Sequence, residues 1–179
     1  MDLIWQSLYL ILPAYFANAA CTLSNKWNWL ARPLDHGKKI GDNYILGPGK
    51  TYRGTIIGLV TAIVTVLLQK FLFSVAIFQN ISLFDYQQIN WLGFGLLGGL
   101  GAVGGDIVAS FFKRRFNLKR GAPAPLLDQW DFVIGFFFLT SLLISVTWPI
   151  IITTLILTLI IHPLTNMVAY LLKIKAVWW

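Results

Sequence analysis

The chain is poor in the side chains that most enzymes use as bases or as metal ligands. It contains one cysteine, two histidines and no glutamate, so all seven of its acidic residues are aspartates. The single cysteine, Cys21, excludes an intramolecular disulfide and a cysteine-based metal cluster, and we expect it to be a small packing residue. The histidines are His36 and His162, and His162 stands in an apolar run before Pro163, where a packing role is expected. A reaction that needs a side-chain general base would be poorly served by this composition.

Charged residues are also scarce. They make up 12% of the 179 residues, whereas 57% are hydrophobic, and this balance excludes an ordinary soluble domain. Apolar runs of about 20 residues are long enough to cross a hydrocarbon core about 30 Å thick. The first residues, MDLIWQ, lack the basic segment of a signal peptide, and no cleavage site of small residues precedes the first run. We therefore expect that run to be retained as a membrane span.

These runs predict an all-α, polytopic integral membrane protein with five transmembrane helices and cytoplasmic active-site loops, in a single domain over residues 1–179. The predicted spans are residues 3–23, 54–75, 91–112, 131–148 and 150–172. In the third span, Gly95 and Gly99, and then Gly101 and Gly105, have the spacing of small residues that lets helix backbones approach closely. We therefore place this span at the centre of the bundle.

The basic residues are confined almost entirely to one set of loops. With five spans, the loops 25–53 and 113–130 and the carboxy-terminal tail lie on the same side, and they hold thirteen of the fourteen Lys and Arg residues. By the positive-inside rule this side faces the cytoplasm, so the N-terminus lies outside the cell membrane and the C-terminus inside. The net charge of +7 then fits anionic membrane lipids or nucleotide phosphates better than nucleic acid.

Three aspartates lie between residues 104 and 131, among the basic residues. Asp106 stands about two helical turns inside an apolar run, where an ionisable side chain is unfavourable unless it is paired or faces water. Asp128 and Asp131 stand at the start of the next run, where the alternative is that they form a helix cap and its partner. Carboxylate oxygens suit Mg²⁺, which also takes water and substrate phosphates as ligands. The three aspartates together predict a Mg²⁺ and phosphate site at the membrane surface.

Cationic side chains accompany Asp106 on the same predicted helix. Asp106, Ser110, Lys113 and Arg114 share one helix face because they are four, seven and eight residues apart. A phosphate-binding role for these cations has two alternatives. Asp106 could simply pair with Lys113 or Arg114, and the basic run 113–120 could serve only to set the topology.

The segment GPGKT at residues 47–51 invites comparison with a P-loop. The complete motif requires a glycine at position 44, where this chain has Tyr44, and the strand and helix context of the motif is also missing. What remains is a lysine and a hydroxyl group, Lys50 and Thr51, just before a predicted helix whose N-terminal N–H groups can bind phosphate oxygens. Arg53 could add a bidentate phosphate contact.

Three segments resemble motifs of the phosphatidate cytidylyltransferase family. Residues 105–114, GDIVASFFKR, resemble its GDxxxSxxKR segment, and residues 126–131, LLDQWD, resemble its HGGxxDRxD ending, with both aspartates at the same spacing. Residues 50–54, KTYRG, are similar to its KTWEG, with Arg53 in place of Glu. The chain also has PAP at 123–125 in place of HGG, and Gln129 in place of Arg. With the PLDHG and GKTYRG segments, these departures resemble the archaeal branch, the CDP-archaeol synthases.

The resemblance implies a CTP-dependent cytidylyltransferase of archaeal phospholipid biosynthesis. Its lipid substrate would be unsaturated archaetidic acid, a glycerol phosphate with two ether-linked geranylgeranyl chains, and its products CDP-archaeol and pyrophosphate. The implied cofactor is Mg²⁺, held by Asp106, Asp128 and Asp131, and these aspartates and Lys113 form the predicted catalytic set. The predicted substrate-binding residues are Lys50, Thr51, Arg53, Gly54, Ser110, Arg114, Lys119 and Arg120.

Three other functions stay open at the level of sequence. The first is a phosphatidate cytidylyltransferase that acts on ester lipids. The second is a transporter that uses Asp106, although transporters usually show internal repeats and a midplane site, and this chain shows no repeat. The third is a non-catalytic subunit that binds anionic lipid, which would need the basic residues but not three aspartates. The sequence makes no prediction of the oligomeric state.

Overall fold

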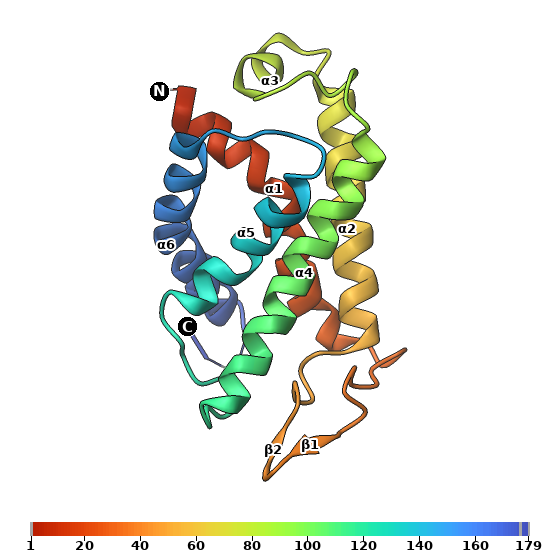
Figure 1. Cartoon of the computed structure of the whole chain (residues 1–179), viewed down its shortest axis with the longest axis vertical. Helices are drawn as coiled ribbons and strands as arrows, with labels where there is room; N and C mark the ends of the chain where they lie inside the picture. Colours follow the sequence, from red (N-terminus) through yellow and green to blue (C-terminus); the bar gives the residue numbers. More distant parts are fainter. Residues whose placement is uncertain (1, 176, 179) are drawn as a thin grey trace.

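Five helices pack side by side, and the chain reverses its direction between each of them and the next (Figure 1). The computed structural model describes residues 2–175, 177 and 178. The five helices are α1 (Asp2–Leu23), α2 (Tyr52–Leu72), α4 (Trp91–Arg115), α5 (Leu127–Thr140) and α6 (Trp148–Leu171). The short elements between them are η1 (Ser24–Lys26), β1 (Lys39–Ile40), β2 (Asn43–Tyr44) and α3 (Ala76–Ile81). The predicted all-α class is confirmed.

Four of these helices, α1, α2, α4 and α6, are long and apolar enough to cross a membrane. The fifth predicted span, residues 131–148, is wrong in its bounds. α5 has only 14 residues, or about 21 Å of helix against a hydrocarbon core of about 30 Å. Pro149 lies in the first turn of α6, where its missing N–H is tolerated, so the chain must reverse before it. Residues 141–147, which were predicted to belong to the helix, instead form the connection in which the chain reverses.

The span predicted at residues 54–75 also differs at both ends. α2 begins at Tyr52 because Thr51 caps it: the Thr51 Oγ1 atom accepts a hydrogen bond from the Gly54 N–H at 3.2 Å. α2 ends at Leu72, and the chain turns at residues 73–75 into the separate short helix α3. A threonine before an apolar run therefore sets the first residue of the helix that follows the GPGKT segment.

The helix α4 lies at the centre of the bundle and packs against α1, α2 and α5. A methyl group on Gly95 would lie 2.9 Å from Ile63 Cα of α2, and one on Gly99 would lie 2.8 Å from Ala62 Cβ. On another face of α4, a methyl group on Gly101 or Gly105 would collide with backbone atoms of α5. Both predicted glycine pairs thus form helix contacts, and the second pair fixes the distance between α4 and α5.

Aromatic side chains fill the interior between α4, α5 and the loop before α4. Tyr86, Phe94, Phe132 and Phe136 are all buried, and the rings of Phe94 and Phe136 meet edge to face at 5.7 Å. Phe132 lies beside His162 of α6, with 6.0 Å between the ring centres. The core therefore reaches the neighbourhood of His162, where a cavity begins.

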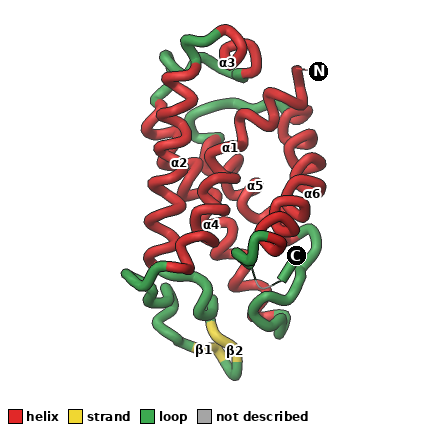
Figure 2. The backbone as a smooth tube through the Cα atoms, turned by 180° about the vertical axis from the view of Figure 1, so that it is seen from behind, coloured by secondary structure: helices red, strands yellow, loops and turns green. Residues whose placement is uncertain are grey.

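The two ends of the bundle differ in charge. One end, here called the polar end, carries the loops 24–51 and 116–126 and the tail after α6, and the opposite end carries the start of α1 and α3 (Figures 1 and 2). Lys70, the one basic residue outside the predicted cytoplasmic loops and tail, lies 5.3 Å from the ring centre of Trp91. The predicted placement of both long polar loops and the tail at one end is confirmed.

A single carboxylate organises the loop before α2. Asp35 accepts hydrogen bonds from the backbone N–H groups of Gly37, Leu46 and Gly47 at 2.8–2.9 Å. Burial alone would raise the pKa of Asp35, but these N–H groups outweigh it and hold the pKa below its usual value. An isolated β-bridge between Pro33 and Thr51 closes the loop at its base. The closed loop presents the segment before α2 to the helix bundle.

Candidate active site

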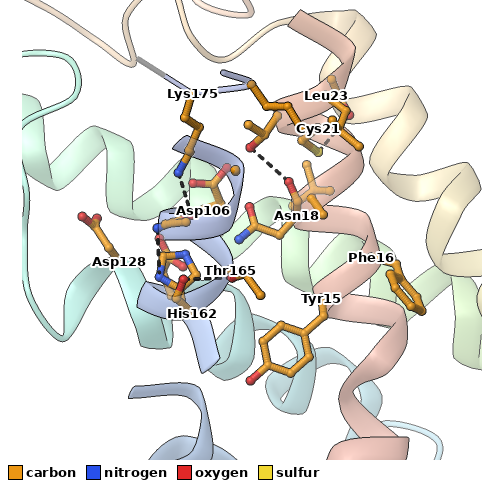
Figure 3. Close-up of a pocket in the computed structure, with 18 of the residues that line it drawn as sticks. Tyr15, Phe16, Asn18, Cys21, Leu23, Asp106, Asp128, His162, Thr165 and Lys175 are labelled. Atoms are coloured by element: carbon orange, nitrogen blue, oxygen red, sulfur yellow. Dashed lines mark hydrogen bonds between the residues drawn. The ribbon is translucent and has the colours of Figure 1, made fainter. Parts of the chain in front are cut away.

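A cavity of about 880 Å³ lies at the polar end, with walls from α1, α4, α5, α6 and the N-terminus of α2. The three aspartates predicted from the sequence, Asp106, Asp128 and Asp131, all line it. Figure 3 draws Asp106, His162 and Lys175 among the residues that line it, together with Asn18 of α1. The fold therefore brings together carboxylates from two helices that are separated by the whole loop 116–126.

Asp106 forms an ion pair with Lys50. The Lys50 Nζ atom lies 2.5 Å from Asp106 Oδ2, and the two residues are 56 positions apart in the chain. Burial alone would lower the pKa of Lys50, but the charge and hydrogen bond of Asp106 outweigh it and raise the pKa. The alternative in which Asp106 pairs with Lys113 or Arg114 is wrong, because its partner comes from the loop before α2.

Asp128 forms the second ion pair of the site, with Lys113 from the last turn of α4. Its Oδ2 atom also accepts a hydrogen bond from the Ala124 N–H at 3.0 Å, which closes the turn that leads into α5. The N-cap position of α5 is Leu126, and no side chain caps it. The helix-cap alternative for Asp128 and Asp131 is therefore wrong, since both stand inside the helix.

Asp131 differs from the other two carboxylates in its surroundings. The two ion pairs formed among the described residues do not include it, and its Oδ1 atom accepts a hydrogen bond from the Phe132 N–H at 2.6 Å. It also lines a second, apolar cavity of about 410 Å³ between α4 and α5. Its backbone is the part of α5 against which Gly105 packs. The close approach of α4 and α5 thus fixes the position of this aspartate relative to Asp106.

Part of the predicted substrate-binding set lines the cavity. Lys50, Thr51 and Gly54 do so at the N-terminus of α2, and Lys113 of the predicted catalytic set does so at the end of α4. The N–H groups of the first turn of α2, which the sequence offered to phosphate, are occupied: those of Tyr52 and Arg53 donate to the oxygens of Arg32 and Leu30, and that of Gly54 donates to Thr51 Oγ1. Gly49, Lys50 and Thr51 of the GPGKT segment therefore reach the cavity without forming a P-loop.

Three other predicted residues lie outside the cavity wall. Arg53 is 3% exposed, and its guanidinium donates a hydrogen bond to the backbone oxygen of Trp27, which ties α2 to the segment after α1. Ser110 is buried. Arg114 donates a hydrogen bond from Nε to the Leu46 oxygen at 3.4 Å, which fastens the loop of Asp35 to α4. These contacts hold the loops in place, and substrate binding by the three residues stays a prediction.

Lys119 and Arg120 are exposed in the loop after α4 and are not among the residues that line the cavity. The Arg120 guanidinium lies against Gly49, since a methyl group there would be 3.5 Å from Arg120 Nε. Arg120 is therefore next to the segment that carries Lys50. Substrate binding by both residues also stays a prediction.

Sequence reasoning missed one wall of the cavity. His162, Thr165 and Asn166 of α6 line it together with Lys175 of the tail. The His162 Nδ1 and Asn166 Nδ2 atoms are 3.5 Å apart, and Lys175 Nζ donates a hydrogen bond to Asn166 Oδ1 at 2.7 Å. The available signal was the spacing of the three α6 residues, which puts them on one face of an otherwise apolar helix. His162 therefore lines the cavity in addition to packing against the core.

Known proteins resemble this chain over its whole length. A family model described as CarS-like, CDP-archaeol synthase, matches residues 1–179. CDP-archaeol synthase of Methanocaldococcus jannaschii is 39% identical over 179 residues, which are 99% of this chain and 98% of the relative. The enzyme of the same name from Methanopyrus kandleri is 42% identical over 178 residues, which are 97% and 92% of the two chains.

A solved structure agrees with the fold. It is described as "Structural insight into an intramembrane enzyme for archaeal membrane lipids biosynthesis" and superposes with a TM-score of 0.73 at 29% identity. The match covers 89% of this chain and 91% of that one. With its apolar helices, this likeness makes the chain a multi-pass membrane protein. The full-length family match and the two relatives show, in addition, that the chain belongs to the CDP-archaeol synthase family.

Proposed function

We propose that this protein transfers CMP from CTP to unsaturated archaetidic acid and so forms CDP-archaeol and pyrophosphate. An oxygen of the lipid phosphate attacks the α-phosphorus of CTP, a new P–O bond forms, and the bond from that phosphorus to the β-phosphate oxygen breaks. The observation that carries the proposal is the convergence of three aspartates and two ion-paired lysines on one cavity, in a chain of this family. The family match also favours an ether lipid over an ester lipid as the substrate.

The two ion-paired lysines would serve the nucleotide. Lys50 stands beside Thr51 at the N-terminus of α2, where its ammonium group and the positive end of the helix dipole together favour a triphosphate. Lys113 stands at the end of α4 beside Asp128. A bound triphosphate gives both lysines a second anionic partner, so they can stabilise the charge that moves onto the leaving pyrophosphate.

The proposed reaction does not need a side-chain base. A phosphate monoester has a second pKa near 6, so the lipid phosphate is largely a dianion at neutral pH and attacks without losing a further proton. Positioning the two phosphates and neutralising their mutual repulsion are then the main tasks of the site. A chain without glutamate, whose cavity brings three aspartates and three lysines together, is suited to these tasks.

The carboxylates fit Mg²⁺ as an ion shared with the substrate. No three His, Cys, Asp or Glu side chains within the described part of the chain form a ready metal cluster. Mg²⁺ commonly takes one or two protein carboxylates and completes its shell with water and phosphate oxygens. Asp106, Asp128 and Asp131 offer such oxygens in one cavity, and they would hold the ion. When bound, it would neutralise charge on the triphosphate.

We further propose that the polar end faces the cytoplasm of the archaeal cell, because it carries the basic loops and because CTP is a cytoplasmic substrate. The N-terminus would then lie outside the cell membrane. The lipid would reach the cavity from within the membrane.

The direct test is pyrophosphate release by the purified protein. We expect release from CTP in the presence of Mg²⁺ and unsaturated archaetidic acid in mixed micelles, and none without the lipid. Chelation of divalent cations should abolish it, and added Mg²⁺ should restore it. Equal rates with an ester-linked phosphatidic acid would show that the ether lipid is not selected, and no release with either lipid would refute the proposed function.

A further inference from the structure

The tail after α6 returns a lysine to the cavity. α6 ends at Leu171, Lys173 adopts a left-handed conformation with φ of 57°, and the backbone N–H groups of Ile174 and Lys175 both donate to the Ala169 oxygen. This is a helix-terminating turn that fixes the direction of the tail. As a result Lys175 lines the same cavity as Asp106 and His162 (Figure 3), whereas Lys173 is exposed.

Lys175 has a different partner from the other two lysines of the cavity. Lys50 and Lys113 are each held by an aspartate, in the two ion pairs that the described residues form. The Lys175 Nζ atom is held by a neutral group, the amide oxygen of Asn166, at 2.7 Å. An amide orients an ammonium group but leaves its charge uncompensated. Lys175 is therefore the cavity lysine most ready to accept an anionic ligand.

The electrostatic surroundings of Lys175 agree with this reading. Burial lowers the pKa of Lys175, and the more distant charges of Asp128 and Asp106 oppose that effect. A half-buried ammonium group that has lost part of its water gains more from a phosphate than an exposed one does. The aspartates of the site are thus close enough to act electrostatically on Lys175. A ligand that spans the site would contact both Lys175 and the part of the cavity that carries these aspartates.

Lys175 also lies where the polar and apolar parts of the cavity wall meet. The end of α6 and the tail add Val168, Leu172 and Ile174 to the wall, and α1 adds apolar residues from Phe16 back to Trp5. Between Asn18 and Trp5, α1 covers about 20 Å. Lys50 stands on a different wall of the cavity, at the start of α2. An amphiphile with a phosphate headgroup would therefore place that phosphate at the α6 side, where its chains continue along apolar surface.

We infer that Lys175, positioned by Asn166, binds the phosphate of the lipid substrate. Lys50, at the start of α2, is left for the phosphates of the nucleotide. This inference rests on the proposed function, because it assigns one of the two substrates to one wall of the cavity. In this arrangement the ammonium group reduces the repulsion between the attacking phosphate and the triphosphate, and it adds to the affinity for lipid more than for CTP.

The test compares two lysines of the same tail. Lys175→Met removes the charge but keeps the aliphatic stem, Lys175→Arg keeps a cation, and Lys173→Met is the matched control on the exposed neighbour. Steady-state rates of pyrophosphate release are measured against unsaturated archaetidic acid in mixed micelles and, separately, against CTP. We expect Lys175→Met to raise the KM for the lipid about 10-fold or more, as for a lost charged hydrogen bond. The KM for CTP should stay within about 2-fold, and Lys175→Arg should recover most of the lipid affinity.

The outcomes separate this inference from the proposed function. If the parent protein is active and Lys175→Met leaves the KM for the lipid unchanged, or raises the KM for CTP instead, Lys175 does not bind the lipid phosphate. If Lys173→Met raises the KM for the lipid as much as Lys175→Met does, the increase is due to the net charge of the tail and not to a contact of Lys175. If Lys175→Met does not fold, Asn166→Leu removes the positioning amide and should still raise the KM for the lipid selectively. A parent protein without activity on any lipid phosphate would instead refute the proposed function.

Discussion

At the residue scale, the site is built from charges that are distant in the sequence. The Lys50–Asp106 pair joins the loop before α2 to the middle of α4, and the Lys113–Asp128 pair joins the end of α4 to the start of α5. Each cation makes a carboxylate tolerable inside an apolar bundle. Asp131 takes part in neither pair, so a ligand is the natural source of its compensating charge.

The sharpest residue-scale prediction concerns Asp131. Asp131→Asn should lower kcat/KM for CTP by about 100-fold or more, because an amide cannot replace the carboxylate in the proposed role of holding a cation against the triphosphate. The amide oxygen can still accept the Phe132 N–H, so we expect the thermal unfolding temperature in detergent to stay close to that of the parent. The control is Asp42→Asn, at an exposed position in the turn between β1 and β2. Near-normal turnover of Asp131→Asn would remove Asp131 from the catalytic set.

At the scale of elements, the geometry of the site depends on how closely α4 approaches its neighbours. Gly95 and Gly99 face α2, whereas Gly101 and Gly105 face α5. The two helices that carry the aspartates can therefore touch through their backbones near Asp131. Side chains of ordinary size on this face would separate Asp106 from Asp131.

This contact predicts opposite behaviour for two adjacent glycines. Gly105→Ala should destabilise the protein by about 1–3 kcal/mol, as overpacking does, because the added methyl group collides with the Asp131 backbone. Gly104→Ala should be neutral or slightly stabilising, since a methyl group there meets nothing within 4 Å and alanine favours the helix. Thermal unfolding of both variants in the same detergent measures the difference. Equal stability of the two would show that α4 and α5 are not in backbone contact at Gly105.

The loop before α2 gives a second element-scale prediction, on pH. The folded pKa of Asp35 is lowered, so its contribution to stability is present above the unfolded pKa of about 3.9 and is lost as the pH falls through the folded value. We therefore expect the loop to stay closed from pH 5 to pH 8 and to open in more acidic solution. Asp35→Asn should open it at every pH, because the anionic acceptor of three N–H groups is gone.

Limited proteolysis measures the opening, since Lys38 and Lys39 lie within this loop as trypsin sites. Asp35→Asn should be cleaved there several times faster than the parent at neutral pH. Asp42→Asn, at an exposed position of the same loop, should be cleaved at the parent rate. Slow cleavage of Asp35→Asn would mean that the bridge between Pro33 and Thr51 closes the loop without the carboxylate.

At the scale of the whole molecule, the separation of charge between the two ends decides the orientation in the membrane. Both long polar loops and the tail lie at the polar end, while the start of α1 and the short helix α3 lie at the opposite end (Figure 2). An odd number of chain passages between the two ends follows from this arrangement. The short α5 makes one of these passages with the help of residues 141–147.

The orientation can be read by labelling single cysteines. Cys21 is the only native cysteine, and Cys21→Ser keeps a donor for the Gly54 oxygen, which the Cys21 Sγ atom reaches at 3.0 Å. In that background, Lys38→Cys reports on the polar end and Asn80→Cys on the opposite end. In intact cells an impermeant maleimide should label the cysteine at position 80 and reach the one at position 38 only after permeabilisation. The reverse pattern would place the polar end outside.

The sequence by itself determined which stretches are helical and where the charges lie. Apolar length decides membrane helices because an unpaired backbone cannot stay in hydrocarbon, and the aspartates of α4 and α5 stand out against that background. The glycine spacing of α4 was readable for the same reason, since close packing needs small residues at fixed intervals. The end of α5 was not readable, because the segment 141–147 is mostly apolar and suits a helix as far as the residues before Pro149.

Only the tertiary structure decided which charges meet. The sequence offered Lys113 and Arg114 as partners of Asp106 because they share its helix face, yet the partner is Lys50, delivered by a loop that Asp35 closes. Likewise, the polar face of α6 and the returning Lys175 join the cavity through contacts between distant segments. Periodicity reports the faces of one element, whereas ion pairs form wherever packing brings opposite charges within a few ångströms, and that depends on the whole fold.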